Sequence, residues 1–394
     1  MQDIIVVGSG FSGSILARKI AEELNRKVIV VESRSHPGGN AYDKVDEHGI
    51  LVQQYGPHFL HTDKYEIIRF LSQYAELFPH WVKLVSQIDG KYVRLPFNFQ
   101  TVQELVGPEK AEHLLRALRL SFRGRDRVPV LELVQHANAD IRAFGNLLFE
   151  KAYRTYTAKM WGIGVEEIDP YVLERVPMAM SYDERYLNKD FQYLPKNGFH
   201  EIFEHMLDHP NIEVRYDTDA MEHITLDESN GKVLYDGEET PALIFTGAID
   251  ELFVYRYGEL PYRSLDIRYS HCDAEEVLPC EIVSYPQAEG YTRRTEYRRF
   301  MFSDFGAEGT VIATEYPMDF NRDGEVGNIR YYPVNTAASD ILYRKYLKEK
   351  EKFSNIFLCG RLAEFKYYNM DVCIEHALKY FQQVRTCLEH GHNA

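Results

Sequence analysis

The stretch that decides the fold is Ile4–Glu32, IIVVGSGFSGSILARKIAEELNRKVIVVE. Its first four residues are β-branched and apolar, which is typical of a buried strand in a parallel sheet. A glycine-rich turn follows, then a helical pattern over Ser14–Leu24 and a second buried strand over Lys27–Val31 that ends at Glu32. Strand, glycine turn, helix, strand and acid in this order predict a Rossmann-like dinucleotide-binding unit, in which the acid lies roughly 20 residues after the turn.

The residues of this turn suit a bound diphosphate. Gly8, Gly10 and Gly13 permit a tight turn and a close approach of the pyrophosphate to the N-terminus of the helix. Phe11, at the start of that helix, is predicted to contact the cofactor as well. The carboxylate of Glu32 can accept a hydrogen bond from an adenosine ribose hydroxyl.

A second glycine turn, Pro37-Gly38-Gly39-Asn40, follows directly. Chains that bind FAD in an extended pose often place such a turn beneath the pyrophosphate and the flavin, whereas NAD-binding chains usually lack it. Gly38, Gly39 and Asn40 are therefore predicted to bind the cofactor, and the expected cofactor is FAD.

The overall charge limits the classes of partner. The chain has 394 residues, of which 45% are hydrophobic, and its formal net charge is -15. Nucleic acids and anionic membranes need a basic protein face, so neither is expected as a partner. No run approaches the roughly 18 apolar residues of a membrane span. Individual arginines must reverse the field locally if an anionic ligand binds.

Cysteine usage predicts the compartment. The five cysteines form no CxxC pair and are odd in number, which suggests neither a zinc knuckle nor a disulfide framework. We interpret them as reduced thiols of a cytoplasmic protein. No signal peptide is expected, because the apolar run that begins at Ile4 leads straight into the glycine turn.

The rest of the chain predicts an α/β fold of interleaved domains. Strand patterns over Ile212–Tyr216, Leu243–Thr246 and Ile356–Cys359 are expected to complete the nucleotide-binding sheet, with helices over Gly198–Leu207 and Met370–Leu388. Residues 102–156 are mainly helical in pattern, and 262–334 alternate at period two as an antiparallel sheet does.

These patterns predict three domains. A Rossmann-like FAD-binding domain is assembled from the discontinuous segments 1–80, 197–250 and 336–394. A helical domain with a mobile loop occupies 102–178, and an antiparallel β-sheet substrate domain is formed by 81–101, 179–196 and 251–335.

One motif is ambiguous from its spacing alone. The stretch Tyr55–Thr62, YGPHFLHT, places His58 and His61 three positions apart. Such a pair can bind a metal or act as a base. A metal normally needs three or four ligands, and no third His, Asp or Cys has a supporting spacing, so no metal is expected here.

A series of motifs along nearly the whole chain resembles the UDP-galactopyranose mutase family. They are VVGSGFSG, VESRSHPGGNAYD, YGPHFLHT, LPFNFQT, YTAKMWG, RVPMAMSYDERY, FQYLPKNGF, YTRRTE, YYPVN and CGRLAEFKYYNMD. The resemblance implies an isomerase that interconverts the pyranose and furanose forms of a nucleotide sugar, most often UDP-galactose. It implies reduced FAD as cofactor, with no net redox change and a covalent adduct between flavin N5 and the sugar.

The resemblance also implies the roles of individual residues. Arg175 on the mobile loop and Arg293 on the sheet stabilise the diphosphate, for which a guanidinium is well suited. His58 and His61 lie beside the isoalloxazine ring. The other residues implied to bind substrate are Asn98, Tyr153, Tyr156, Trp161, Tyr186, Ser284, Tyr332, Tyr367 and Asn369. Gly360, Arg361 and Met370 are implied to contact the flavin.

The sequence departs from the family pattern around the substrate. Asn369 replaces an aspartate, Ser284 an asparagine, Ala152 an aromatic residue that packs on uracil, and Ala179 a second arginine of the mobile segment. UDP-galactose remains the first expectation, and a GDP- or dTDP-linked hexose, 6-deoxyhexose or heptose is the alternative. A more remote alternative is an amine-oxidase-type flavin oxidoreductase, which leaves the two diphosphate-binding arginines unexplained.

Three further expectations follow from the resemblance. The product would feed galactofuranose into surface polysaccharide biosynthesis. An unidentified partner would reduce the flavin. The protein would form a homodimer.

Overall fold

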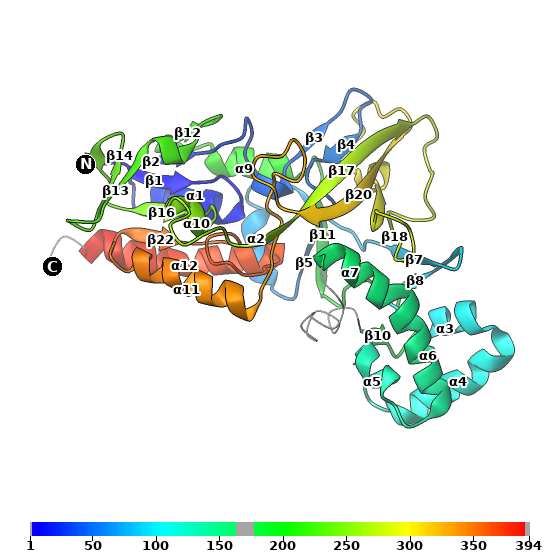
Figure 1. Ribbon diagram of the computed structural model, residues 1–394. Helices are drawn as coiled ribbons and strands as arrows, with labels where there is room; N and C mark the ends of the chain where they lie inside the picture. The colour runs from blue at the N-terminus through cyan, green and yellow to red at the C-terminus, as the bar shows by residue number, and fades with distance from the viewer. Residues whose placement is uncertain (1, 163–176, 391–394) are drawn as a thin grey trace.

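The computed structural model describes residues 2–162 and 177–390 of the chain (Figure 1). A parallel sheet with helices lies at one side of the molecule, a long antiparallel ribbon rises beside it, and a helical region extends below the ribbon. These parts confirm the predicted α/β class with a Rossmann-like unit. The exact domain boundaries stay a prediction.

The parallel sheet has five strands in the order β12-β2-β1-β16-β22. Their bounds are Ile212–Arg215, Val28–Val31, Ile4–Val7, Leu243–Phe245 and Ile356–Leu358. β1 pairs with β2 and with β16, and every pair in the sheet is parallel. The first strand of the fingerprint therefore lies at the centre of the sheet.

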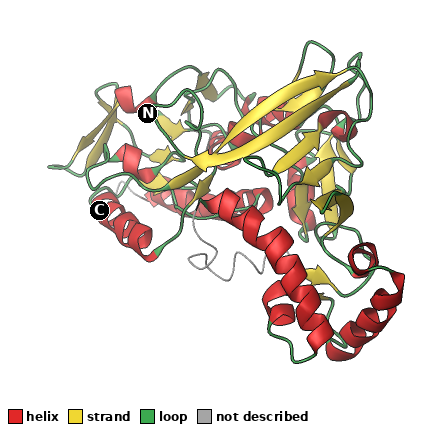
Figure 2. Cartoon of the chain, turned by 45° about the vertical axis from the view of Figure 1, so that its right-hand side comes forward, coloured by secondary structure: helices red, strands yellow, loops and turns green. Residues whose placement is uncertain are grey.

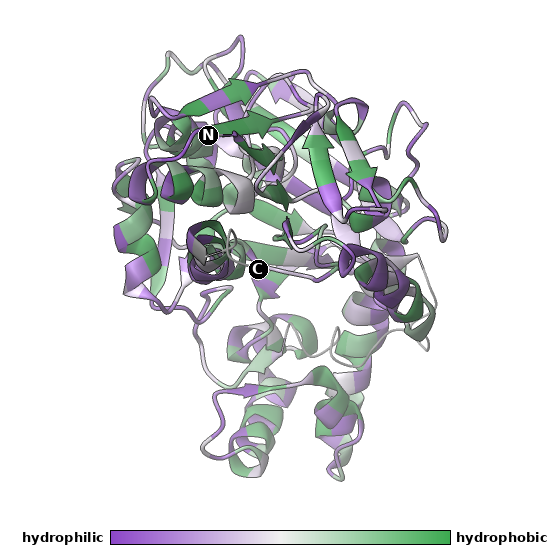
Figure 3. Ribbon diagram, turned by 90° about the vertical axis from the view of Figure 1, so that its left-hand side faces the viewer, coloured by the Kyte–Doolittle hydropathy of each residue, from purple (hydrophilic) through white to green (hydrophobic). Residues whose placement is uncertain are grey.

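Both faces of this sheet are covered, which explains its continuous apolar strands. Ile4 and Val6 pack on one face with the helices α1 (Phe11–Glu23), α9 (Phe199–Leu207) and α12 (Met370–His390). Ile5 packs on the other face beneath α10 (Ile249–Leu252), α11 (Ala337–Lys350) and the small sheet β13-β14-β15 (Ile224–Asp227, Lys232–Tyr235, Glu238–Glu239). The strands inside the molecule are mostly green in Figure 3, the colour of hydrophobic residues.

The helix α11 is absent from the sequence prediction. It begins after Thr336, whose hydroxyl accepts a hydrogen bond from the Ser339 N–H. In return, the Thr336 N–H donates to the Ser339 hydroxyl. This capping box is a local start signal that the sequence does contain.

The second large sheet has seven strands in the order β21-β17-β20-β19-β18-β7-β8. The bounds are Tyr332–Pro333, Tyr262–Cys272, Thr310–Asp319, Arg293–Glu296, Ile282–Ser284, Leu84–Ile88 and Lys91–Leu95. β17 and β20 form the long ribbon of Figures 1 and 2. The expectation of a wholly antiparallel sheet is wrong at one pair, since β18 and β7 run parallel. These two strands come from distant segments, so no hairpin turn dictates their relative direction.

The helical region consists of α3 (Phe99–Val106), α4 (Pro108–Ser121), α5 (Val130–Val134) and a continuous rod. The rod comprises α6 (Ala139–Leu148), the π-helix η2 (Phe149–Arg154) and α7 (Thr155–Trp161). It leads from the helical region back to the seven-stranded sheet (Figure 2). A short pair, β9 (Arg127–Val128) with β10 (Met178–Ala179), closes the region.

A small sheet holds the second histidine of the YGPHFLHT motif. It has the order β5-β11-β6 (Leu60–Thr62, Phe191–Pro195, Leu77–Pro79), and His61 in β5 pairs with Gln192. The hairpin β3-β4 (Asp43–Val45, Leu51–Gln53) precedes this sheet in the chain, and α2 (Tyr65–Leu71) follows β5. Among residues 2–162 and 177–390, no helix combines the length and the apolar character that crossing a membrane requires.

Candidate active site

The two glycine turns are in contact at the carboxyl end of β1. Gly8 and Gly38 have φ values of +90° and +99°, a region that favours glycine. The Gly38 N–H donates to the Ser9 carbonyl at 2.9 Å. A Cβ atom on Gly39 would lie 3.3 Å from the Gly10 Cα. One on Gly13 would lie 1.9 Å from the Gly8 carbonyl oxygen, so Gly13 permits close packing of α1 on the turn.

Glu32 ties the end of β2 to the first turn. Its carboxylate is 5% exposed and accepts hydrogen bonds from the Ser9 N–H at 2.9 Å and the Ser9 hydroxyl at 2.6 Å. Its other oxygen accepts from the Arg34 N–H at 3.0 Å. The predicted ribose acceptor is therefore held at the carboxyl edge of the parallel sheet.

The ring of Phe11 is part of the core, and the contact of Phe11 with a cofactor stays a prediction for its backbone. Its side chain is buried, with the ring centroid 4.6 Å from that of Phe203 and 6.4 Å from that of Phe199. The ring therefore packs α1 against α9. Only the backbone of Phe11, at the N-terminus of α1, is placed to serve a cofactor.

Arg34 is a site residue that the sequence prediction missed. One guanidinium nitrogen, Nη2, donates to Asn40 Oδ1 at 2.9 Å, and the guanidinium lies 4.1 Å from the ring centroid of Tyr55. The other nitrogen, Nη1, is buried and has no hydrogen-bond partner within the described part of the chain. A buried cationic donor beside two glycine turns fits the diphosphate of FAD. The sequence signal that could have identified Arg34 is its position two residues after Glu32, the predicted ribose acceptor.

His58 is held as a neutral imidazole. Gln53 accepts from the His58 N–H at 2.5 Å and donates to its carbonyl at 2.8 Å. The ring Nδ1 lies 2.8 Å from the Gly56 carbonyl, which can only accept, so Nδ1 carries the proton and Nε2 has the lone pair. Burial, together with the smaller effect of the Arg361 and Arg293 charges, lowers the pKa of His58 to about 4.

His61 also remains neutral and has an unsatisfied nitrogen. Burial lowers the pKa of His61, against the opposing charge of Asp371. Its Nδ1 is buried without a hydrogen-bond partner among residues 2–162 and 177–390. The unpaired atoms of His61 and Arg34 fit a cofactor with a hydrogen-bonding ring system and a diphosphate, as FAD has.

Arg293 and Glu315 form a bidentate pair on neighbouring strands. Arg293 Nε and Nη2 each donate to a Glu315 carboxylate oxygen at 2.7 Å. The Glu315 side chain is 1% exposed, whereas the Arg293 side chain is 23% exposed. Burial opposes the charged form of Arg293, yet the adjacent Glu315 carboxylate holds its pKa well above the ordinary value. Ser284, on β18, lies opposite Arg293 in the sheet register.

Tyr332, Tyr367 and Arg361 form a second group. The two tyrosine rings stack at 5.4 Å, and the Arg361 guanidinium lies 5.6 Å and 5.4 Å from their centroids. Arg361 donates to the backbone carbonyls of Tyr331 and Tyr368. Burial raises the pKa of Tyr332 to about 12, so its hydroxyl keeps its proton and can donate to an anion.

Helix α7 brings Tyr156 to this group. Burial raises the pKa of Tyr156, and the positive charge of Arg293 opposes this rise, so the two side chains are near enough to interact electrostatically. Lys159 holds the helix in place by donating to the carbonyls of Tyr285, Ala288 and Tyr291 at 2.8, 2.8 and 2.9 Å. Trp161 is the last residue of α7.

The structure thus gathers several predicted residues, but not all of them. Those that interact with one another electrostatically or by stacking are His58, Tyr156, Arg293, Tyr332, Arg361 and Tyr367. Tyr186 acts electrostatically on Tyr156 and on Tyr153. Asn369 and Met370 stand at the start of α12, directly after this group. Gly360, at φ +107°, is closely packed on Ser12. Arg175 lies outside the described residues.

Two substituted positions, Ala152 and Ala179, are buried. Ala152 belongs to the core of the helical region, where Tyr153 is also buried with its ring 5.6 Å from that of Phe97. Ala179 is buried in strand β10, and its N–H donates to the Phe97 carbonyl at 2.7 Å.

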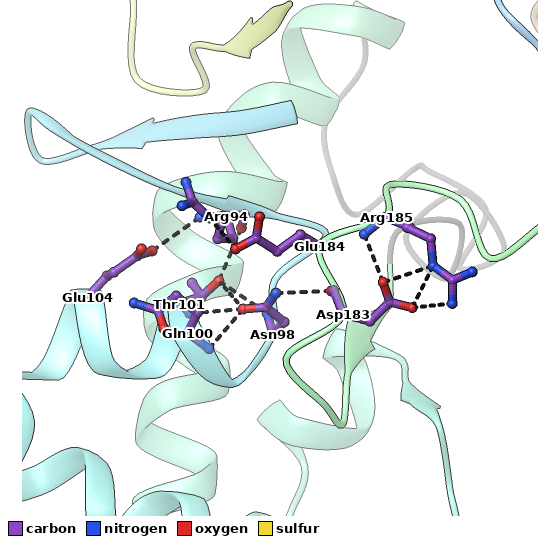
Figure 4. Close-up of polar contacts among 8 residues, drawn as sticks. All are labelled: Arg94, Asn98, Gln100, Thr101, Glu104, Asp183, Glu184 and Arg185. Atoms are coloured by element: carbon purple, nitrogen blue, oxygen red, sulfur yellow. Dashed lines mark hydrogen bonds and ion pairs between the residues drawn. The ribbon is translucent and has the colours of Figure 1, made fainter. Parts of the chain in front are cut away.

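Asn98 has a structural role at the start of α3, and its contact with substrate stays a prediction. Its side chain is fully buried and caps α3, accepting from the backbone N–H groups of Gln100 and Thr101 at 2.9 and 3.1 Å (Figure 4). Its amide also donates to the Asp183 carbonyl at 3.1 Å. An N-cap asparagine before an apolar helix is a local signal for this role.

Comparison with known proteins identifies the family of the chain. The family model described as UDP-galactopyranose mutase matches residues 151–367, and an NAD(P)-binding Rossmann-like domain model matches 6–74. The chain is 32% identical to dTDP-fucopyranose mutase of Escherichia coli over 385 residues, covering 96% of this chain and 97% of that protein. It is 32% identical to UDP-galactopyranose mutase of Mycoplasma pneumoniae over 387 residues, covering 97% and 96%.

Solved structures share the fold. A crystal structure of reduced UDP-galactopyranose mutase matches with a TM-score of 0.71 at 17% identity, covering 99% of this chain and 96% of that one. A putative protoporphyrinogen oxidase from Exiguobacterium matches with a TM-score of 0.66 at 12% identity, covering 97% and 98%. The sequence similarities over nearly the full length, rather than these shared folds, separate the mutases from the oxidases. The chain belongs to the UDP-galactopyranose mutase family, whose enzymes are FAD-dependent isomerases.

Proposed function

We propose that this protein interconverts the pyranose and furanose forms of a nucleotide sugar, with UDP-galactopyranose as the first candidate substrate. The observation that carries the proposal is the Arg293 guanidinium, held by the buried Glu315 within electrostatic reach of Tyr156, Tyr332 and His58. A fixed cation surrounded by tyrosine hydroxyls suits a sugar diphosphate.

The cofactor would be held by residues of both glycine turns and of the C-terminal segment. Gly8, Gly10, Gly38 and Gly39 leave space for the diphosphate, and Glu32 is placed for the ribose. The other residues proposed to contact it are Arg34, Asn40, His58, His61, Gly360, Arg361 and Met370. Reduced FAD, when bound, would supply a nucleophile for the anomeric carbon of the sugar.

The protein's own residues serve the leaving diphosphate. Glu315 engages Nε and Nη2 of Arg293, so the guanidinium is oriented before substrate arrives and its remaining N–H groups can meet diphosphate oxygens. Tyr332 is a protonated donor at neutral pH. A nucleoside diphosphate leaves as a stable anion, so these charges and donors replace the carboxylic acid of a glycosidase.

Arg175 is proposed as a second contact to the diphosphate from the family pattern. Tyr156, Trp161, Tyr186, Ser284, Tyr367 and Asn369 are proposed to contact the nucleoside or the sugar. His58 presents the lone pair of Nε2 at neutral pH, so it can accept a hydrogen bond inside the site.

The second candidate is a dTDP-linked 6-deoxyhexose. The chain is as similar to the Escherichia coli dTDP-fucopyranose mutase as it is to the Mycoplasma pneumoniae UDP-galactopyranose mutase. Asn369 and Ser284 change the polar groups near the sugar relative to the family pattern. An amide can donate as well as accept, so Asn369 can serve a differently placed hydroxyl or a 6-deoxy centre.

One experiment tests both the mutase activity and the identity of the substrate. The dithionite-reduced, FAD-loaded enzyme is incubated separately with UDP-galactose, dTDP-fucose and a GDP-hexose, and furanose products are separated by chromatography. The oxidised enzyme is the control. Furanose from none of these sugars would refute the mutase proposal. Competitive titration with UDP, dTDP and GDP then decides the base, because a tenfold preference for dTDP or GDP would refute UDP-galactose.

We further propose a cytoplasmic homodimer that receives electrons from a separate flavin reductant. The five cysteines are all free thiols, which supports a reducing compartment. Light scattering of the purified protein measures the oligomeric state, and a monomer at micromolar concentration would refute the dimer.

A further inference from the structure

Three potential metal ligands from separate segments meet beside the candidate active site. Cys359 follows strand β22, Glu364 lies in the following turn, and His376 projects from α12. His376 Nδ1 lies 3.7 Å from Cys359 Sγ and 3.3 Å from a Glu364 carboxylate oxygen, Oε2. All three atoms are within 4.8 Å of one another.

Hydrogen bonding among the three side chains accounts for one of the two distances at a time. A ring nitrogen carries either one N–H or one lone pair, and either points in a single direction. If Nδ1 donates to Glu364, it cannot also accept from the Cys359 thiol. If it accepts from the thiol, its lone pair faces the carboxylate. When Nδ1 donates to Glu364, the Cys359 thiol has the Ser12 hydroxyl as its partner, and a cation between the three atoms would replace both hydrogen bonds.

We propose that Cys359, Glu364 and His376 form a binding site for Zn²⁺. A zinc ion bonds to imidazole nitrogen and carboxylate oxygen at about 2.0–2.1 Å and to thiolate sulfur at about 2.3 Å. Around a tetrahedral ion these bond lengths give separations of roughly 3.3 Å between nitrogen and oxygen and roughly 3.6 Å between nitrogen and sulfur. The distances in the cluster are close to both values.

The surroundings orient each ligand as a metal site requires. The Gly360 N–H donates to Glu364 Oε2 at 2.9 Å, and the Tyr368 hydroxyl donates to Oε1 at 3.2 Å. The His376 ring stacks on Tyr380, with centroids 5.5 Å apart and planes at 23°. These contacts hold the carboxylate and the imidazole in place from outside the cluster.

The charge and proton balance of binding can be stated. Zn²⁺ binds the thiolate form of cysteine, so the Cys359 proton leaves to solvent on binding, and the thiolate and the Glu364 carboxylate then neutralise the dication.

Binding would connect β22 to α12 across the turn at residues 360–369. That turn carries Arg361, Tyr367 and Asn369 of the candidate active site. The ion would therefore stabilise the segment that presents these residues. The metal site does not depend on which sugar, if any, the enzyme converts, so a failure of either proposal leaves the other standing.

The test is a zinc titration of untagged, FAD-loaded protein in a phosphine reductant, after removal of metals with a chelator. Competition with a chromophoric zinc chelator is expected to give one Zn²⁺ per chain. Cys359→Ser and His376→Gln should each weaken binding at least tenfold. The matched controls are Cys387→Ser, on the same helix α12, and His113→Gln, an exposed histidine of α4; both should bind as the wild type does.

Two further readouts identify the ligands. Calorimetry in buffers of different ionisation enthalpy should show that the wild type releases about one proton per Zn²⁺ bound. The Cys359→Ser variant, which lacks this thiol, should not release that proton. X-ray absorption should show sulfur at about 2.3 Å together with nitrogen or oxygen at about 2.0–2.1 Å. Less than half an equivalent of bound Zn²⁺, or equal affinity in wild type and His376→Gln, would overturn the proposal. If Cys359→Ser does not fold, His376→Gln and Glu364→Gln decide the question.

Discussion

Replacing Glu315 with glutamine should disturb both the stability and the activity of this enzyme. Glu315→Gln keeps the size of the side chain but removes its charge. The amide oxygen can accept from one of the two Arg293 nitrogens that lie 2.7 Å away, while the amide NH₂ group faces the other donor. The guanidinium is then left without its counterion in a largely desolvated setting.

The magnitude follows from the burial of the pair. Removing one partner of a buried ion pair typically costs about 3–5 kcal/mol. Arg293 is 23% exposed, so water can recover part of this loss, and we expect about 3 kcal/mol. If the same free energy is lost in the transition state, where the diphosphate departs, kcat/KM should fall roughly 100-fold.

The assay is a double-mutant cycle on FAD-loaded protein, with thermal unfolding and furanose formation as readouts. Glu315→Gln and Arg293→Gln should each lower the unfolding temperature by several degrees. The double variant should recover part of this loss, because it leaves no unpaired charge. The control is Glu259→Gln, whose exposed pair with Arg322 spans 3.1 Å and should contribute less than about 0.5 kcal/mol. An unchanged unfolding temperature for Glu315→Gln, together with strict additivity in the cycle, would refute the reasoning.

Four other outcomes are expected. Arg175→Ala and Arg293→Ala should each lower kcat/KM more than tenfold, since each removes a charge-assisted contact worth about 1.5–3 kcal/mol, and near-normal kinetics would exclude them from the site. Asn98→Ala should lower the free energy of unfolding by about 1–2 kcal/mol through loss of the helix cap, and a large fall in kcat/KM of the folded protein would support a substrate role. The pKa of His58 is about 4 in the folded chain and 6.5 in the unfolded one, so the unfolded state takes up the proton first as the pH falls. Stability should therefore decline from pH 6.5 to 4, by at most about 3 kcal/mol, and a pH profile identical to that of His58→Gln would contradict this. The purified protein should be yellow and active only after reduction, and equal turnover by the oxidised form would exclude a nucleophilic flavin.

The sequence by itself determined the cofactor-binding half of this protein, because its signals are local. The apolar run Ile4–Val7, the glycines after it and the acid at Glu32 each depend on their neighbours in the chain, and the structure places them at the centre and the carboxyl edge of the parallel sheet. Family membership likewise followed from motifs that can be compared one by one, and the similarity to known mutases confirms it.

Side-chain direction was decided only in three dimensions. The motif that contains Phe11 was predicted correctly, yet its ring turns into the core because α9 packs against α1. Asn98 was predicted to contact substrate, and in the structure its side-chain oxygen caps α3 while its amide nitrogen donates to the Asp183 carbonyl. A motif specifies which residues are near a site, whereas packing specifies which of their atoms face it.

The tertiary structure alone decided the pairings between distant segments. Glu315 carries no local signal, and it becomes the partner of Arg293 because β19 and β20 are neighbours in register. Cys359, Glu364 and His376 show no metal-ligand spacing along the chain, and they meet because α12 folds back over the end of β22. Such contacts depend on strand order and helix packing, which are set by the burial of the whole core rather than by any short stretch of sequence.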